Sequence, residues 1–240
     1  MRTLSRLLAA TVLAVAPATP ARAVTIDLFE WIVNVDGTIA DSSFGDPLPG
    51  GVNAAGFNTT TGLGSISVSL NSAGAHFVGL FVDDEIDEAI NSFFNEFGST
   101  TGAPVAGERW EIDEPGFAFG DIFDHINNSN NVGGSLLDNA NGVPAGLEDD
   151  VSMALGWDYT LAAGQTSAIS FLISEIRPIS GFYLTQTDPD SQASIYFSST
   201  LDIRTPGGAV IPEPGTIALY GLGLGLAAIA GLRRQQRVEV

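Results

Sequence analysis

The 240-residue chain contains no cysteine, no lysine and only two histidines. Without cysteine the protein has no disulfide, no thiol nucleophile and no thiolate metal site. His76 and His125 cannot form a zinc site by themselves. His76 opens a hydrophobic stretch and is expected to be structural. His125 follows Asp121 and Asp124, which leaves two interpretations: a weak metal site with those carboxylates or, as the favoured one, a surface histidine in a polar loop.

Positive charge is scarce in the central part of the chain. Between residues 24 and 211, 26 acidic residues face three arginines, so the formal charge there is about −23. Such a charge excludes nucleic acid and anionic lipid as partners, because both would be repelled. It keeps an exported protein soluble at the expense of self-repulsion, which divalent cations would relieve.

Catalytic signatures are also missing. The sequence contains no Gly-x-Ser-x-Gly elbow, no His-Glu-x-x-His and no phosphate-binding glycine loop after a strand. With so many acidic residues, a carboxylate pair at glycosidase spacing is expected by chance. Trp31, Trp110 and Trp157 lie in strand-like stretches, where they are expected in the core rather than on a sugar-binding surface. We therefore expect a protein that is not an enzyme.

What the sequence does contain is a series of short runs rich in β-formers, separated by Gly, Asn, Asp and Pro. Residues 24–208 are long enough for one domain with a sizeable core. The runs predict an all-β fold, an antiparallel β-sandwich that is jelly-roll-like. The expected strands are 24–35, 65–70, 76–83, 108–112, 151–159, 167–174 and 194–203.

Two stretches depart from this pattern. Glu85 to Phe97 carries apolar residues at roughly helical spacing and is the one predicted helix, with a strand pair broken near Asn91 as the alternative. Asn127 to Leu147 is rich in Asn and Gly and is predicted to be a long loop.

Clustered carboxylates are the candidate ligands for a bound ion. Calcium takes six to eight oxygen ligands, and extracellular modules bind it at roughly 10⁻⁴ to 10⁻³ M. No twelve-residue calcium loop is present, so a solvated acidic rim remains the favoured alternative. The candidate calcium ligands are Asp83, Asp84, Glu85, Asp87, Asp149 and Asp150.

The N-terminus has the features of a signal peptide. Arg2 and Arg6 give a positive start, residues 7–16 are apolar, and Ala21-Arg22-Ala23 fits the small-x-small cleavage pattern. Cleavage after Ala23 is expected, with an uncleaved N-terminal anchor as the alternative.

The C-terminal thirty residues combine a polar motif, an apolar stretch and a basic end. Residues 216–232 carry no charge and would cover roughly 25 Å as a helix, near the lower limit for a transmembrane span. Arg233 and Arg234 would resist crossing the membrane. Pro212 and Pro214 keep the preceding segment extended and Glu213 accessible.

Pro212-Glu213-Pro214 followed by a hydrophobic span and Arg233-Arg234 resembles the PEP-CTERM sorting signal of Gram-negative, exopolysaccharide-producing bacteria. The resemblance implies that residues 209–240 are a sorting tail, recognised and cleaved by exosortase. It also implies transient anchorage in the inner membrane through 216–232. The stretches 77–87, 149–157 and 195–201 resemble exported portions of other PEP-CTERM proteins, which have no assigned activity.

Two functions follow as expectations. The first is a non-enzymatic protein of the cell surface or extracellular matrix, with exosortase and exopolysaccharide as partners. The alternative is a calcium-dependent carbohydrate-binding or adhesion module on the same scaffold.

Overall fold

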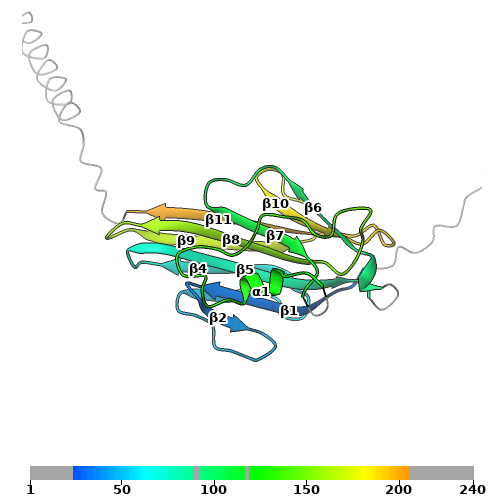
Figure 1. Cartoon of the computed structure of the whole chain (residues 1–240), viewed down its shortest axis with the longest axis horizontal. Coiled ribbons are helices and arrows are strands. Elements are labelled where there is room, and N and C mark those ends of the chain that lie inside the picture. The colour runs from blue at the N-terminus through cyan, green and yellow to red at the C-terminus, as the bar shows by residue number, and fades with distance from the viewer. Residues whose placement is uncertain (1–23, 89–91, 117–118, 206–240) are drawn as a thin grey trace, which may run out of the picture.

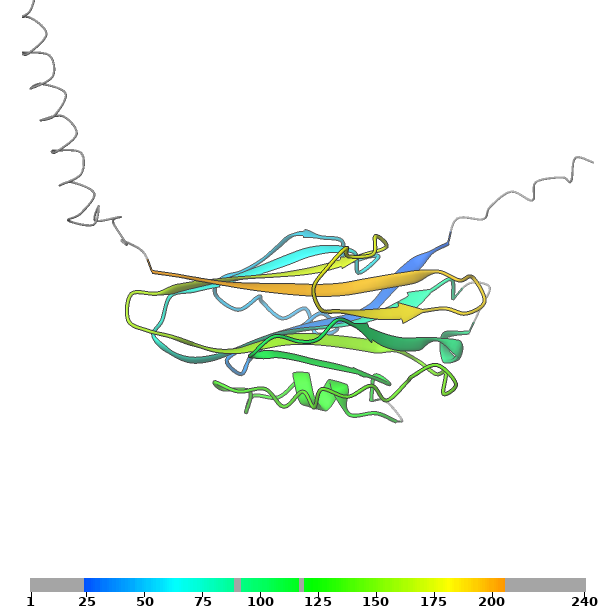
Figure 2. The ribbon, with the colours of Figure 1, turned by 90° about the horizontal axis from the view of Figure 1, so that it is seen from above.

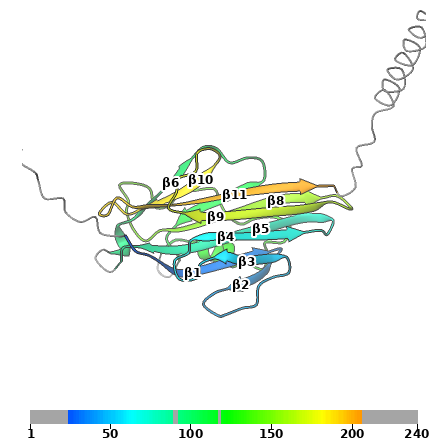
Figure 3. The ribbon, with the colours of Figure 1, turned by 180° about the vertical axis from the view of Figure 1, so that it is seen from behind.

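The computed structural model describes residues 24–88, 92–116 and 119–205. Strands in these ranges pair antiparallel throughout and form two sheets, which confirms the predicted β-sandwich (Figure 1). The first sheet has the order β2 (Thr38–Asp41), β1 (Ile26–Val35), β5 (Gly74–Ile86), β8 (Ser152–Leu161) and β7 (Glu108–Asp113). The second has the order β3 (Val52–Phe57), β4 (Gly64–Leu70), β9 (Thr166–Ser174), β11 (Ser194–Arg204), β10 (Tyr183–Thr187) and β6 (Phe97–Thr101), seen in front in Figure 3.

The main core lies between the two sheets and follows from strand alternation. On β5, Val78, Leu80 and Val82 are fully buried against the second sheet. On β9, Phe171 and its neighbours two residues away are buried while the intervening residues are exposed. Side chains on a strand alternate between the two faces, so each sheet presents one apolar face to the other.

The outer face of the first sheet is covered by α1 (Ile122–Ile126) and the loop that follows it, as Figure 2 shows. Phe77 and Phe81, one position out of phase with the core residues of β5, point to this face. They form a second hydrophobic cluster with Ile122 and Ile126 of α1. A short helix is marginal alone, so this packing rather than helix propensity stabilises α1.

All seven predicted strands are confirmed, as β1, β4, β5, β7, β8, β9 and β11. Strands β2, β3, β6 and β10 and helix α1 were not predicted. The strand β3, Val-Asn-Ala-Ala-Gly-Phe, consists largely of poor β-formers, and it forms because β4 supplies its hydrogen-bond partners. Residues 127–147 contain no named helix or strand, as predicted for a long loop.

The predicted helix over Glu85 to Phe97 is wrong. Glu85 and Ile86 belong to β5, where Ile86 pairs with Ile26 of β1, and Phe97 begins β6. Between these strands the described residues form a 3₁₀ turn, Phe93–Asn95, and an isolated antiparallel bridge from Glu96 to Asp149. Pairing with β1 overrides the helical spacing, and Asp87, at φ +61°, ends the strand. The alternative of two strands with a break is therefore closer to the structure, although Asn91 lies outside the described residues.

The predicted signal peptide with Ala21 and Ala23, and the whole sorting tail, also lie outside the described residues. In the ranges that the structure describes, no helix has the length and apolarity that crossing a membrane requires. The jelly-roll-like detail of the fold remains a prediction.

Candidate functional site

Asp83, Glu85 and Asp150 come together at one end of the first sheet, on its outer face. Asp83 and Glu85 are two residues apart on β5, so they point the same way. Asp150 immediately precedes β8, the neighbour of β5. One carboxylate oxygen from each of the three lies within 4.8 Å of the others. Asp83 is held in place by the hydroxyl of Ser152, which donates to it at 2.8 Å.

Asp83 and Glu85 are buried, Asp150 is half-buried, and no arginine or histidine among the described residues forms an ion pair with them. Burial, reinforced by the charge of Asp150, raises the pKa of Asp83 well above its usual value. Burial followed by the charge of Asp150 raises the pKa of Glu85 to about 8, and burial and the charge of Asp149 raise that of Asp150 to about 6. Glu85 is 8% exposed, and its Oε2 has no hydrogen-bond donor among the described residues. A cation would supply what this oxygen lacks.

These carboxylates line a pocket of about 630 Å³. Its wall also includes Phe94 and Phe119, whose side chains are mostly exposed. The pocket is therefore lined by both carboxylates and exposed aromatic rings, which suits a ligand with a polar and an apolar face.

The other three candidate calcium ligands are placed differently. Asp84 points to the opposite side of β5, into the core, where it is fully buried and both carboxylate oxygens lack a donor in the described part of the chain. Asp87 caps the end of β5 and accepts hydrogen bonds from the backbone and hydroxyl of Thr25. Asp149 lines the pocket, and its Oδ1 accepts from the backbone of Asp150. The structure thus joins three of the six residues in one cluster, with Asp149 beside it.

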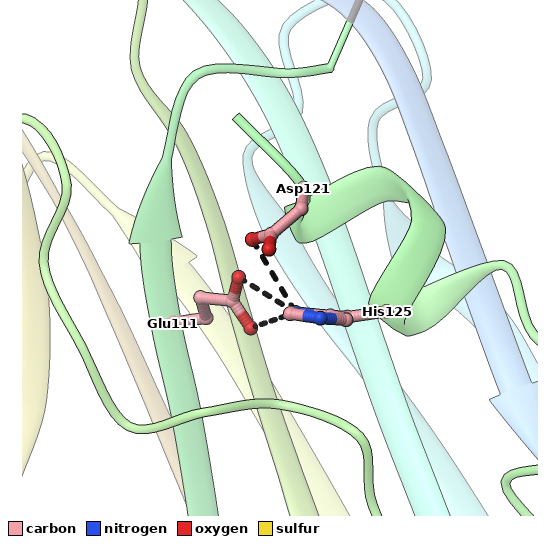
Figure 4. A group of neighbouring side chains, drawn as sticks. All are labelled: Glu111, Asp121 and His125. Atoms are coloured by element: carbon pink, nitrogen blue, oxygen red, sulfur yellow. Dashed lines mark hydrogen bonds and ion pairs between the residues drawn. The ribbon is translucent and has the colours of Figure 1, made fainter. Parts of the chain in front are cut away.

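A second group, Glu111, Asp121 and His125, lies elsewhere on the same outer face (Figure 4). His125 belongs to α1, and its Nδ1 is 2.9 Å from both carboxylate oxygens of Glu111 on β7 and 3.5 Å from Oδ1 of Asp121. The sequence favoured a surface histidine in a polar loop over a weak metal site with Asp121 and Asp124. The favoured prediction is wrong, because His125 lies on α1, is half-buried and contacts Glu111, which neither interpretation included. The available signal was strand alternation, which turns Glu111 away from the core when Ile112 points into it.

His76 and the tryptophans have the structural places expected of them. His76 is buried, with Nδ1 2.7 Å from Asp36 and Nε2 2.8 Å from the carbonyl of Ser72. Trp31 and Trp157 lie in the main core, and Trp110 packs against it. None of the three is an exposed platform for sugar rings.

Comparison with known proteins identifies the C-terminal segment. Residues 210–235 match the family model of the PEP-CTERM protein-sorting motif. No curated protein and no solved structure matches the chain. The matched segment contains Pro212, Glu213 and Pro214 and also Arg233 and Arg234. The motif implies export, transient membrane anchorage and exosortase as the processing partner. The chain therefore carries a PEP-CTERM protein-sorting motif at residues 210–235, as its C-terminal residues predicted.

Proposed function

We propose that this is a non-enzymatic protein of the surface or extracellular matrix of a Gram-negative bacterium, released there after exosortase cleaves its tail. The observation that carries the proposal is the sorting-motif match at residues 210–235. The charge of about −23 on residues 24–211 supports it, because such a domain stays soluble once released. We propose exopolysaccharide as the partner of the released protein in the matrix.

The division of labour in the tail follows from its chemistry. Pro212, Glu213 and Pro214 are the proposed recognition motif, and neither proline has an amide hydrogen that a helix would require. Residues 216–232 are a marginal span suited to temporary anchorage. Arg233 and Arg234 hold the end of the chain on the cytoplasmic side.

The test replaces the motif in a host that has exosortase. In the double variant Pro212→Ala, Glu213→Ala, the unprocessed chain should accumulate in the membrane and release should fall. Pro206→Ala, a proline replacement outside the matched segment, is the control and should be processed normally. Normal processing and release of the double variant would refute the proposed recognition.

A second candidate function is calcium-dependent binding of carbohydrate by the exported domain. The specific observation in its favour is the Asp83–Glu85–Asp150 trio inside a pocket that also carries exposed Phe94 and Phe119, where Oε2 of Glu85 has no hydrogen-bond donor among the described residues. An ion held by the trio would offer open coordination positions to sugar hydroxyls, and the rings would contact the apolar face of a sugar.

A glycan array probed with the purified exported protein tests this function. Binding is expected in 1–10 mM calcium, within the range of extracellular calcium modules. It should disappear with a chelator and in Asp150→Asn. Glycan binding that survives both treatments would contradict the calcium-dependent mode.

A further inference from the structure

The second carboxylate group has the composition of a transition-metal site. Glu111 reaches it from β7 and is 1% exposed, while Asp121 reaches it from the N-cap of α1 and His125 from the helix itself. The spacing of four residues places Asp121 and His125 one above the other on the same side of the helix. One ligand atom from each of the three residues lies within 4.8 Å of the others, and both carboxylates point to the imidazole of His125 (Figure 4).

The orientation of the Asp121 side chain also favours a metal site. It stands at the N-cap of α1, where an aspartate usually accepts a hydrogen bond from the helix backbone, yet its side chain makes no such bond. The carboxylate is directed at the imidazole instead, with Oδ1 3.5 Å from Nδ1 of His125. That separation is too long for a good hydrogen bond but suits two ligands of one ion.

The distances fit zinc chemistry. Zinc binds imidazole nitrogen and carboxylate oxygen at about 2.0–2.2 Å, so two ligands of a tetrahedral ion are about 3.4 Å apart. The Asp121–His125 separation of 3.5 Å already meets this value. The Glu111–His125 separation of 2.9 Å has to lengthen by about half an ångström when the ion replaces the shared proton. Asp121 is 61% exposed at its side chain, which leaves a path for the ion and for a water ligand.

The local charge also calls for a cation. Glu111 and Asp121 share the position, Asp113 accepts a hydrogen bond from the backbone of Asp121, and Asp138 donates its backbone amide to Glu111 at 3.1 Å. The carboxylates of Glu111 and Asp121 therefore both face the imidazole of His125. Hydrogen bonds from backbone amides, such as that of Asp138 to Glu111, hold the ligand side chains in their orientations. Contacts of this kind set the orientation of ligands in metal sites. Asn131 donates to the carbonyl of His125 at 2.7 Å.

We propose that Glu111, Asp121 and His125 bind a divalent transition-metal ion of the zinc class, separate from the acidic pocket. One imidazole with two carboxylates favours zinc over calcium, which prefers oxygen ligands alone. The bound ion links α1 to β7 and so fastens the helix over the second hydrophobic cluster of Phe77 and Phe81. His76 cannot add a ligand, because both its ring nitrogens are occupied.

The experiment titrates the full chain, purified in mild detergent and stripped with a chelator, with zinc alone, manganese alone and calcium alone. Calorimetry should show one zinc ion bound to this site, and the melting temperature should rise. Asp121→Asn is the main variant, since this exposed side chain can change without disturbing the core. Its zinc affinity should fall by about tenfold or more. Asp124→Asn on the same helix makes the same charge change outside the group and should bind zinc as the unmodified chain does.

A nitrogen NMR measurement provides a second readout that does not depend on stability. The chain has only two histidines, so their ring signals are easily distinguished. Zinc should shift Nδ1 of His125 and leave His76 unchanged, and His125→Gln should abolish the binding. Three results would overturn the proposal: no zinc binding, zinc binding that Asp121→Asn and His125→Gln leave intact, or a preference of this group for calcium.

Discussion

Ser152 donates a hydrogen bond at 2.8 Å to Asp83, its direct partner across the β5–β8 ladder. The bond fixes a buried carboxylate on the outer face of the sheet, next to Glu85 and Asp150. Because Ser152 is neutral, it orients the carboxylate without cancelling its charge. The repulsion among the three acids therefore remains for a cation to relieve.

We predict that calcium stabilises the protein through this trio. For a dissociation constant of ~10⁻³ M, 10 mM calcium adds about 1.4 kcal/mol to the free energy of unfolding. In a domain of this size that raises the melting temperature by roughly 3–6 °C. Asp150→Asn should remove most of the increase, whereas Glu175→Gln, an exposed acid away from the pocket, should retain it. Thermal melts of chelator-treated protein with and without calcium measure the effect, and an unmoved melting curve would rule it out.

We predict that stability falls as the pH rises and that Asp84 contributes to the fall. Burial, reinforced by the charges of Asp83 and Glu96, raises the pKa of Asp84 well above its ordinary 3.8. Burial likewise raises the pKa of Glu96 to about 8. Above the ordinary value, the folded state retains protons that the unfolded state has released. Stability is therefore full at low pH and declines as the pH rises towards the folded pKa values.

Asp84→Asn tests this prediction because asparagine has nearly the same shape and no charge. Near pH 5 the variant should already be the more stable, because Asp84 has released its proton in the unfolded state of the unmodified protein and keeps it in the folded state. At pH 8 the advantage of the variant should be larger. Urea unfolding at the two pH values, in chelator, gives the comparison, and an advantage confined to pH 5 would show that the sign is wrong.

We predict that Gly62→Ala destabilises the fold through contact with Asp84. Gly62 has φ +66°, and a Cβ there would lie 1.8 Å from Oδ1 of Asp84. Gly45 has the same φ and nothing within 4 Å of its Cβ position, so Gly45→Ala isolates the backbone strain of roughly 1–2 kcal/mol. Gly62→Ala should cost clearly more than this control in urea unfolding. Equal losses of unfolding free energy in the two variants would contradict the prediction, because Asp84 would then move aside without destabilising the fold.

We predict that the exported protein has lost both ends of the chain. Its mass should correspond to a start at Val24 and an end near Pro212–Pro214, because the signal peptide and the membrane span are removed. Arg233→Ala with Arg234→Ala should reduce processing, since the tail then lacks the charges that hold it in the membrane. Intact-mass measurement of secreted protein checks both ends, and a secreted form that retains residues 216–232 would contradict the prediction.

Much of the fold was predictable because strand patterns are local. In Ser65–Leu70 and Ser167–Ser174, apolar and polar residues alternate because one face of each strand is buried. This pattern indicates a strand whichever sheet covers the buried face. Strand β10 and helix α1 were missed because their sequences carry no such signal. Strand β10 forms because it pairs with β11 and β6, and helix α1 forms because it packs in the second hydrophobic cluster.

The sequence alone determined the acidic charge, the absence of thiol chemistry and the sorting motif, since each depends only on which residues are present and in what order. Tertiary structure decided which carboxylates meet. Asp83, Asp84 and Glu85 are adjacent in the chain, yet alternation along β5 sends Asp84 into the core and the other two to the outer face. Glu111 and His125 are separated by 14 positions in the sequence, and the packing of α1 on the first sheet brings Nδ1 of His125 to 2.9 Å from the carboxylate of Glu111.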